Sequence, residues 1–422
     1  HYSILEKLRP GQLLVVASVG YAYLNPRFLT RVNVFRFWPT KLVLALAFLA
    51  CASAPFGISL GSSGLFIINN YAKTLAYAFL LALAIRHVRD LFTFVWAYVV
   101  ACGILAYFSI FVFGITKQGH GFVTRLNNLD TYDSNDLCVV LMVGLPLTLL
   151  LLSVSRGVKR WLLLLIFIGI SITMARSGSR GGFLGFLAVG ASALFIVNTI
   201  STSRKVLMLS AAAIALALGA PPGYWQQMGT ILSPKDDYNY TDSDGRKAVM
   251  QRGIGYMNDY PVFGLGMDNF SKAECTISPK ISPSRLYGPL RCTPPHNSYL
   301  QAGAELGYPG LLIWGSLVFA GILVPLRIRR RLPRSMLQGT EVERFTYAAT
   351  GFFALSMIGF AVTSFFVSFA WMDPVYFMAA MLAGLYVTLD TEFRFALGDR
   401  KPIEGWRVIR SRMLMGEGAA KS

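Results

Sequence analysis

Long apolar blocks alternate with short polar segments along almost the whole chain. The blocks are close to the ~20 residues that an α-helix needs to cross the hydrocarbon core of a bilayer. Because lipid offers the backbone no hydrogen-bond partner, such blocks are expected to be helical. The blocks are residues 10–25, 41–57, 64–85, 91–113, 135–154, 161–175, 182–199, 205–220, 299–325, 345–367 and 372–390. The pattern predicts an all-α, polytopic integral membrane bundle of about 11–12 helices.

Basic residues in the short connections predict the orientation of this bundle, because short basic loops stay on the cytoplasmic side. Such loops lie near residues 27–41, 86–89, 156–160, 204–205 and 327–334. The loops expected outside are those near residues 58–63, 114–134, 176–181, 221–298 and 368–371. Eleven spans leave the N-terminus outside, whereas Lys7 and Arg9 favour the inside. Either a span is missing before the first residue, a histidine, or one of the eleven spans is wrong, and a total of twelve would remove the conflict.

One connection is far longer than the others and is expected to carry function. Residues 221–298 hold eight basic and seven acidic residues, and residues 246–258 are expected to form a short helix. The chain then divides into a first bundle part (1–220), a long loop with part of the active site (221–298), a second bundle part (299–392) and a basic cytoplasmic tail (393–422).

Composition agrees with a membrane protein and changes the meaning of its charge. The 422 residues are 54% hydrophobic and 14% charged, whereas soluble domains carry about a quarter charged residues. The formal net charge of +18 could indicate a nucleic-acid partner, but its confinement to short loops and the tail indicates membrane topology instead. Among five cysteines, Cys275 and Cys292 share the long loop and could form a disulfide if that loop is extracytoplasmic.

A first candidate site is the turn Arg176-Ser177-Gly178-Ser179-Arg180-Gly181-Gly182, between two apolar blocks. Arginine is disfavoured in an outside loop, so two in one short turn need a reason. Arg176 and Arg180 would share a face if the preceding helix continued, and the glycines would let a ligand approach the backbone. Guanidinium groups there suit phosphate oxygens. The alternative is an arginine that reaches lipid headgroups.

A second candidate is the segment from Arg246 to Phe270, where the run from Pro261 to Gly266 predicts a rigid turn toward the membrane. Arg246 and Arg252 are six residues apart, so a regular helix does not put both on one face. One of them could serve the site and the other the fold. The alternative is a solvated loop arginine, which the spacing alone favours.

A third candidate is His296, which follows Pro294 and Pro295 where the long loop re-enters the membrane. Two prolines suit the start of a helix. A neutral imidazole there could accept a proton from a sugar hydroxyl, with Asn297 as a secondary candidate. The alternative, which is the commoner case for a lone histidine, is a histidine that caps a helix or lies at an interface. Glu305 is out of phase with His296 on a helix and is not expected to pair with it.

Two acidic patterns are given less weight. Asp242-Ser243-Asp244 matches the D-x-D of metal-using glycosyltransferases, but such triplets are common in acidic loops. Asp133-Ser134-Asn135-Asp136 resembles a helix cap first and a sugar site second. No His, Cys, Asp or Glu cluster in the sequence has convincing metal spacing, so no metal or other cofactor is expected.

Together these segments resemble the O-antigen ligase and polymerase family. The resemblance lies in Ser179-Arg180-Gly181, in Arg246 followed by Tyr260 through Gly266, and in His296-Asn297-Ser298-Tyr299-Leu300 with Gly307 downstream. It covers mainly residues 130–320. It implies a GT-C-like bundle of about a dozen spans without a nucleotide-sugar domain.

The resemblance also implies a reaction in the bacterial inner membrane, with the active site facing the periplasm. A glycan would pass from undecaprenyl diphosphate to a hydroxyl of lipid A–core in a ligase, or of a growing glycan in a polymerase, without a metal ion. Arg180 and Arg246 would bind the diphosphate, with Arg176 and Arg252 as secondary candidates, and His296 would be the base. A protein O-oligosaccharyltransferase and a transporter of lipid-linked glycans are the competing hypotheses.

Overall fold

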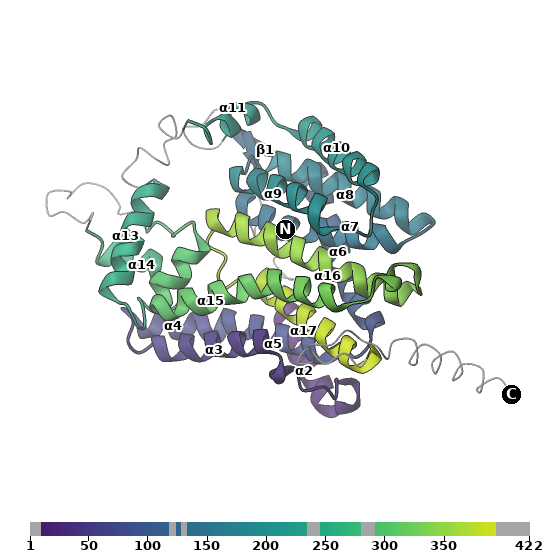
Figure 1. Ribbon diagram of the computed structural model, residues 1–422. Coiled ribbons are helices and arrows are strands. Elements are labelled where there is room, and N and C mark those ends of the chain that lie inside the picture. The colour runs from purple at the N-terminus through teal and green to yellow at the C-terminus, as the bar shows by residue number, and fades with distance from the viewer. Residues whose placement is uncertain (1–9, 118–123, 128–132, 234–244, 280–291, 394–422) are drawn as a thin grey trace.

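The computed structural model is an almost entirely helical bundle (Figure 1). It describes the chain except residues 1–9, 118–123, 128–132, 234–244, 280–291 and 394–422. The α-helices are α2 (Pro10–Leu24), α3 (Trp38–Ser53), α4 (Leu60–Phe66), α5 (Ala72–Ala84), α6 (Val88–Phe111), α7 (Ser134–Val154), α8 (Val158–Arg176), α9 (Arg180–Ile196), α10 (Thr202–Gly219), α11 (Tyr224–Gly229), α13 (Arg246–Asp259), α14 (Phe270–Thr276), α15 (Ser298–Arg331), α16 (Glu341–Thr363) and α17 (Asp373–Phe393).

Shorter elements connect these helices. A π-helical turn, η3 (Ile67–Tyr71), joins α4 to α5. Strands β1 (Ile115–Lys117) and β2 (Thr124–Leu126) form an antiparallel pair in which Thr116 faces Arg125. The 3₁₀ turns are η1 (Pro26–Phe28), η2 (Val34–Arg36), η5 (Arg334–Gln338) and η6 (Ser364–Phe366).

The apolar blocks of the sequence correspond to helices one by one, which confirms the polytopic all-α fold. Within the described residues, eight helical segments are long and apolar enough to cross a membrane, and α2, α3 and α9 are three shorter apolar helices. The total of eleven equals the number of blocks predicted. The expected short helix over residues 246–258 is also confirmed, as α13 (Arg246–Asp259).

Helix α7 forms the centre of the bundle. Among the 18 most apolar consecutive residues of α7, 89% are buried inside the protein. In the corresponding stretch of the span Leu60–Ala84 only 11% are buried. It packs against α16, α8, α9 and α6. Gly144 on α7 approaches Cys102 on α6, and Gly359 on α16 approaches Met142 on α7. Small residues let membrane helices come close enough for dispersion contacts, which drive their association where lipid replaces water.

Helix α15 is broken at Gly307, whose backbone has φ 70° and ψ −175°. The break leaves carbonyl groups without helical partners, and the loop after α13 uses them. Leu265 N donates to Ala304 O at 2.8 Å and Gly266 N donates to Glu305 O at 3.0 Å. On the far side of the break, Tyr308 N donates to Pro261 O at 2.9 Å. The loop predicted as a rigid turn therefore supplies hydrogen-bond partners for the backbone groups at the break in α15. Such partners within the protein are needed where lipid offers none.

Replacing Gly307 with alanine is expected to destabilise this joint. A Cβ at Gly307 would lie 2.6 Å from Pro261 O and Val262 O, in a backbone region that is open almost only to glycine and costs other residues about 1–3 kcal/mol. The measurement is thermal unfolding of purified protein in detergent. Gly315→Ala is the matched control, because that glycine lies on the same helix and a Cβ there meets nothing within 4 Å. Equal melting temperatures for the two variants would contradict the interpretation.

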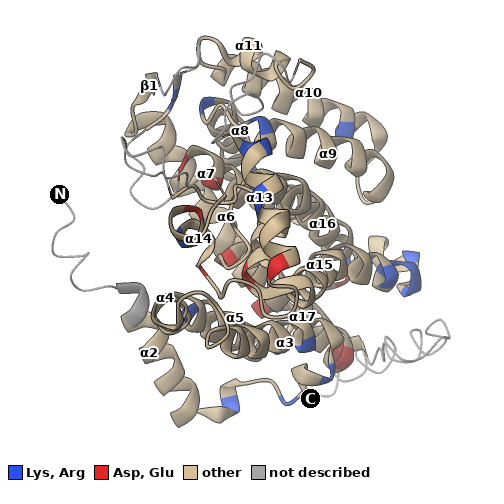
Figure 2. Cartoon of the chain, turned by 90° about the vertical axis from the view of Figure 1, so that its left-hand side faces the viewer, with Lys and Arg blue, Asp and Glu red and all other residues tan. Residues whose placement is uncertain are grey.

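The loops expected outside the membrane gather at one end of the bundle, where α13 and α14 lie (Figure 1). Three hydrogen bonds each join two of these loops. Ile58 N donates to Leu265 O at 2.9 Å. Gln227 Nε2 donates to Gly178 O at 3.0 Å. His296 N donates to Ser368 Oγ at 2.9 Å. We call this end the loop end of the bundle. Figure 2 looks onto it and shows basic segments on α8 and α13 near acidic segments on α7 and α14.

Candidate active site

Arg180 is the first residue of α9 and is positioned by a tight turn. Gly178 adopts φ 61°, a left-handed backbone conformation that favours glycine. Ser179 is the N-cap of α9, and its side chain accepts from Gly182 N at 3.2 Å. The half-buried Arg180 donates from Nη1 to Thr230 Oγ1 at 2.8 Å. Arg180 thus joins the α8–α9 turn to the long excursion after α10.

The turn differs from the sequence expectation in two respects. Helix α8 ends at Arg176 and α9 begins at Arg180, so the two arginines do not share the face of a continuous helix. The glycines after Arg180 accommodate protein rather than a ligand: a Cβ at Gly181 would lie 2.8 Å from Phe366, and one at Gly182 would lie 2.7 Å from Cys138 Sγ. Their role is close helix packing, which a single sequence does not distinguish from room for a ligand.

The two arginines of α13 have different surroundings. Arg252 forms a bidentate ion pair with the fully buried Glu274, with Nε–Oε1 at 2.9 Å and Nη2–Oε2 at 2.7 Å. Tyr256 also donates its hydroxyl to Glu274, at 2.9 Å. Arg246 lies at the first turn of α13 and is half-buried. The sequence predicted that one of these two arginines serves the site and the other the fold. The ion pair with Glu274 gives Arg252 a structural role.

His296 lies directly before α15 in a strained backbone conformation, with φ 47°. Asn297, not His296, caps the helix, because its side chain accepts from Tyr299 N at 2.9 Å and from Leu300 N at 3.0 Å. The capping alternative for the histidine is therefore wrong. Asn297 was predicted only as a secondary candidate for the site, and its role as the N-cap of α15 was not predicted.

The charge state of His296 is set by its surroundings. Its pKa is lowered from the ordinary 6.5 to about 4, first by burial and then by the positive charge of Arg246, while Asp133 acts in the opposite direction. The three side chains are therefore within electrostatic reach of one another. At neutral pH the imidazole of His296 is uncharged and can accept a proton.

The segment around η6 connects Arg180 with His296. Gly181, next to Arg180, packs against Phe366, and two residues further on Ser368 accepts the backbone N–H of His296. Ser298 completes the connection, since its hydroxyl donates to Val367 O at 2.8 Å. Arg180, Arg246 and His296, far apart in the sequence, thus lie at the same end of the bundle.

Arg176 and Asp133 are two further charged groups at this end. The Nε atom of Arg176 is buried and has no hydrogen-bond partner among the described residues. Asp133 caps α7, accepting from Asn135 N and Asp136 N at 2.7 Å, which confirms the cap predicted from the sequence. Its electrostatic effect on His296 was not predicted. One signal could have indicated it, because residues 114–134 are expected on the same side of the membrane as His296.

Glu305 on α15 joins three segments of the loop end. It is 2% exposed and accepts from Trp371 Nε1 at 2.6 Å and from Asp268 N at 2.8 Å. As expected, it does not pair with His296. Its role in tying α15 to the α16–α17 connection and to the loop after α13 was not predicted.

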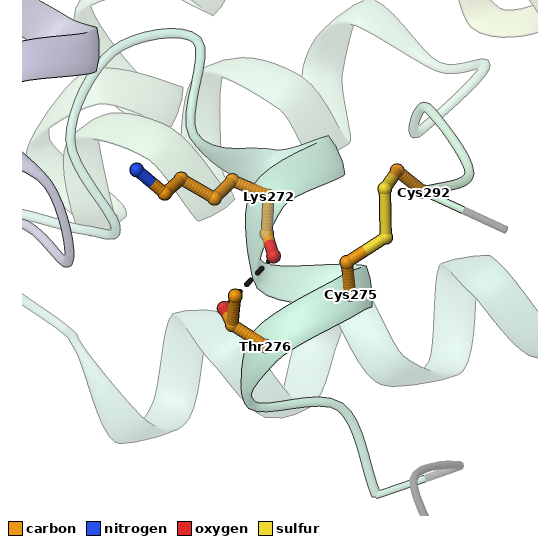
Figure 3. The surroundings of a disulfide bond; sticks show 4 residues. All are labelled: Lys272, Cys275, Thr276 and Cys292. Atoms are coloured by element: carbon orange, nitrogen blue, oxygen red, sulfur yellow. Dashed lines mark hydrogen bonds between the residues drawn. A yellow bond between two sulfur atoms is a disulfide. The ribbon is translucent and has the colours of Figure 1, made fainter. Parts of the chain in front are cut away.

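Cys275 at the end of α14 and Cys292 before α15 form a disulfide, with Cα atoms 5.0 Å apart (Figure 3). The two cysteines are 17 residues apart in the sequence, and the loop that they close lies between α14 and the segment carrying His296. A disulfide of this kind restricts the unfolded chain. It also agrees with an oxidising compartment at the loop end.

An apolar cavity of about 500 Å³ opens beside the site, between α9, α15 and α16. Its lining includes Leu184, one turn from Arg180, Tyr299, three residues from His296, and Phe366, which contacts Gly181. Among the described residues no group of three or more His, Cys, Asp or Glu side chains could hold a metal ion. The Asp242-Ser243-Asp244 triplet lies outside the described residues.

The fold and this arrangement define a multi-pass membrane protein with arginine and histidine side chains gathered at one end of a helix bundle. Residues 163–315 match the family model described as O-antigen ligase, and this range contains Arg180, Arg246 and His296. This match supports the resemblance to the O-antigen ligase and polymerase family that the motifs predicted. No curated protein matches the chain. Since members of the family are glycosyltransferase-like ligases and polymerases, an enzymatic role is supported.

Proposed function

We propose that the protein is an O-antigen ligase, which transfers a glycan from undecaprenyl diphosphate to a hydroxyl of lipid A–core on the periplasmic side of the inner membrane. The observation that carries the proposal is the position of Arg180, Arg246 and His296 at one end of the bundle, within the residues that match the O-antigen ligase family model. A cation for the leaving group and a base for the acceptor are the two functions that this reaction needs.

Arg180 and Arg246 would bind the diphosphate of the donor. Negative charge grows on the diphosphate oxygens as the bond to the sugar breaks, and fixed guanidinium groups stabilise that charge in a site shielded from water. Bidentate hydrogen bonds to phosphate favour arginine over lysine. Thr230, which accepts from Arg180 at 2.8 Å, would hold this guanidinium in place before the donor binds. Two guanidinium groups can replace the divalent cation of nucleotide-sugar enzymes, so transfer is expected to resist chelators.

His296 would remove the proton from the acceptor hydroxyl. Its pKa is about 4, because of burial and the charge of Arg246, and such a weak base is a poor match to neutral pH. A bound diphosphate would offset the charge of Arg246 and raise the pKa of His296. Donor binding would thus make His296 a stronger base toward the acceptor hydroxyl, whose oxygen attacks the sugar as the bond to the diphosphate breaks, so acceptor deprotonation would follow donor binding.

The lipid tail of the donor would occupy the apolar cavity of about 500 Å³ between α9, α15 and α16. Its lining of Leu184, Tyr299, Phe319 and Phe365 suits an isoprenoid chain. Phe319 and Phe365 are exposed at its rim, where membrane lipid would surround them. Because the cavity lies beside Arg180 and His296, a lipid held there would carry its diphosphate to the arginines.

The test is transfer by purified protein in proteoliposomes with undecaprenyl-diphosphate-linked glycan and one acceptor at a time. Addition of the glycan to lipid A–core without further chain extension identifies a ligase. A ladder of lengthened glycans identifies a polymerase of the same family. Movement of the donor across the membrane without a new glycosidic bond identifies a transporter and overturns the proposal.

Replacing Arg180 or Arg246 with glutamine is expected to lower the transfer rate by about 10²–10³-fold, the usual cost of losing one charge-stabilising donor. Lysine at either position should restore only part of the rate, because it lacks the bidentate geometry. Lys247→Gln is the matched control, since Lys247 is an exposed neighbour on α13. The measurement is the initial rate with each variant at equal amounts of folded protein. Wild-type rates for Arg246→Gln would remove the assignment to the diphosphate.

A further inference from the structure

A second cavity, of about 480 Å³, lies between the C-terminal ends of α9 and α15 and the first turns of α16. Since α9 and α15 both begin at the loop end, this cavity belongs to the opposite end of the bundle. Three arginines line it, namely Arg329, Arg330 and Arg334, together with Tyr347 and Asn198. No Asp or Glu is among the described residues of its lining.

Arg329 brings a buried hydrogen-bond donor to this cavity. Its guanidinium carbon lies 5.0 Å from the ring centroid of Tyr347, which fixes the direction of the side chain through a cation–π contact. Its Nη2 atom is buried and has no hydrogen-bond partner among the described residues. A buried donor without an acceptor is costly, and more so when it is charged. An acceptor from outside the chain would remove this cost.

Membrane topology alone does not account for the arrangement. Basic residues are expected where a span ends on the cytoplasmic side, and Arg329, Arg330 and Arg331 lie in the last turn of α15, where the helix dipole favours cations. Both effects are satisfied by arginines that extend into water. Neither requires a cavity into which Arg329, Arg330 and Arg334 all converge.

The same cavity has an apolar side. Phe195 and Leu326 belong to its lining, and Phe195, at the end of α9, is 83% exposed. An exposed phenylalanine at the end of a membrane helix contacts lipid, so the cavity adjoins the acyl region. Convergent arginines beside such a surface match a ligand with a phosphate group and hydrocarbon chains.

We propose that this cavity binds the phosphodiester headgroup of an anionic phospholipid, with the three arginines on the phosphate and the acyl chains along Phe195 and Leu326. Basic pockets between helices at the cytoplasmic surface bind anionic headgroups in this way. Arginine suits the role because its planar fork donates two parallel bonds to phosphate oxygens. The site is separate from the one proposed for glycan transfer.

The test uses the full chain, purified in detergent and stripped of lipid. Phosphatidylglycerol, phosphatidylcholine and inorganic phosphate are each titrated, with bound lipid counted by native mass spectrometry and unfolding followed by temperature. Phosphatidylglycerol is expected to bind and to raise the melting temperature, and phosphatidylcholine at equal concentration is expected to do neither. Equal stabilisation by inorganic phosphate would indicate a site for a soluble anion and would overturn the lipid assignment.

Variants locate the binding. Arg330→Gln and Arg334→Gln change exposed residues, so folding should persist, and each is expected to weaken phosphatidylglycerol binding about fivefold. Arg329→Gln should weaken it at least as much. Arg327→Gln is the control, since Arg327 is exposed on the same turn of α15 and does not line the cavity. A uniform loss across all four variants, or none in any, would show that general surface charge rather than this cavity binds the lipid.

Discussion

Asparagine in place of His296 is expected to lower the rate of glycan transfer by about 10²–10⁴-fold, the contribution typical of a positioned general base. Asparagine is preferred to alanine because it tolerates the left-handed backbone that this residue adopts, with φ 47°. It removes the base while adding little strain. The measurement is the initial rate of transfer in proteoliposomes at saturating donor, with the melting temperature confirming that the variant is folded. Transfer at the wild-type rate would exclude His296 as the base.

The dependence of transfer on pH gives this prediction a second readout. The pKa of His296 in the free enzyme is lowered to about 4, so kcat/KM should be constant above that value and fall only as the imidazole becomes protonated. In Arg246→Gln the lowering by the arginine charge is lost, while the larger effect of burial remains. The acid limb should therefore move to higher pH without reaching the ordinary value of 6.5. An unchanged limb would show that the two residues do not act on each other.

The same shift predicts the effect of pH on stability. Between pH 6.5 and about 4 an unfolded chain protonates this histidine and the folded protein does not. The unfolded state then binds more protons, so the free energy of unfolding decreases as the pH falls through that window. Below the folded-state pKa both states carry the proton and this contribution no longer changes. His296→Asn should reduce the slope of stability against pH within the window.

The spans were predictable because lipid leaves a crossing segment few options. A segment such as residues 91–113, without a charged residue, must be helical to satisfy its backbone, and it became α6. Hydropathy did not distinguish α17, which is largely enclosed by other helices, from the span Leu60–Ala84, which is nearly as apolar and largely unburied. Lipid and protein interior are both apolar, so only the packing in three dimensions separates the two cases.

The candidate residues of the site could be predicted from the sequence, but the interactions that hold their segments in place could not. Arg180 was recognisable because positive charge in an outside turn needs a reason, whereas Arg246 and His296 received their expected roles mainly through the motifs that resemble the O-antigen ligase and polymerase family. The bonds from Leu265 to Ala304 and from Gly266 to Glu305 join segments about forty residues apart, and no local pattern specifies that pairing. The glycines after Arg180 were misinterpreted for a related reason, since their partners, Phe366 and Cys138, are distant in the sequence.

Removing the Arg252 side chain is expected to have the largest effect on stability. Glu274 is fully buried and its carboxylate is held by Arg252 and Tyr256. In Arg252→Met this carboxylate would lose its cation, and breaking a buried pair in this way costs about 3–5 kcal/mol. Helix α14 ends beside the disulfide Cys275–Cys292, so the loss should loosen the segment leading to His296. Thermal unfolding of the purified protein measures it.

A second variant distinguishes a structural role for Arg252 from a role in the active site. Glu274→Gln combined with Arg252→Met leaves no unpaired charge, and neutral replacement of a buried pair is often tolerated. The double variant should therefore recover much of the stability lost in Arg252→Met, with a coupling energy that a double-mutant cycle measures. If Arg252 serves the fold, transfer returns together with stability. A double variant that is stable and still inactive would place Arg252 beside Arg180 and Arg246 as a third ligand of the diphosphate.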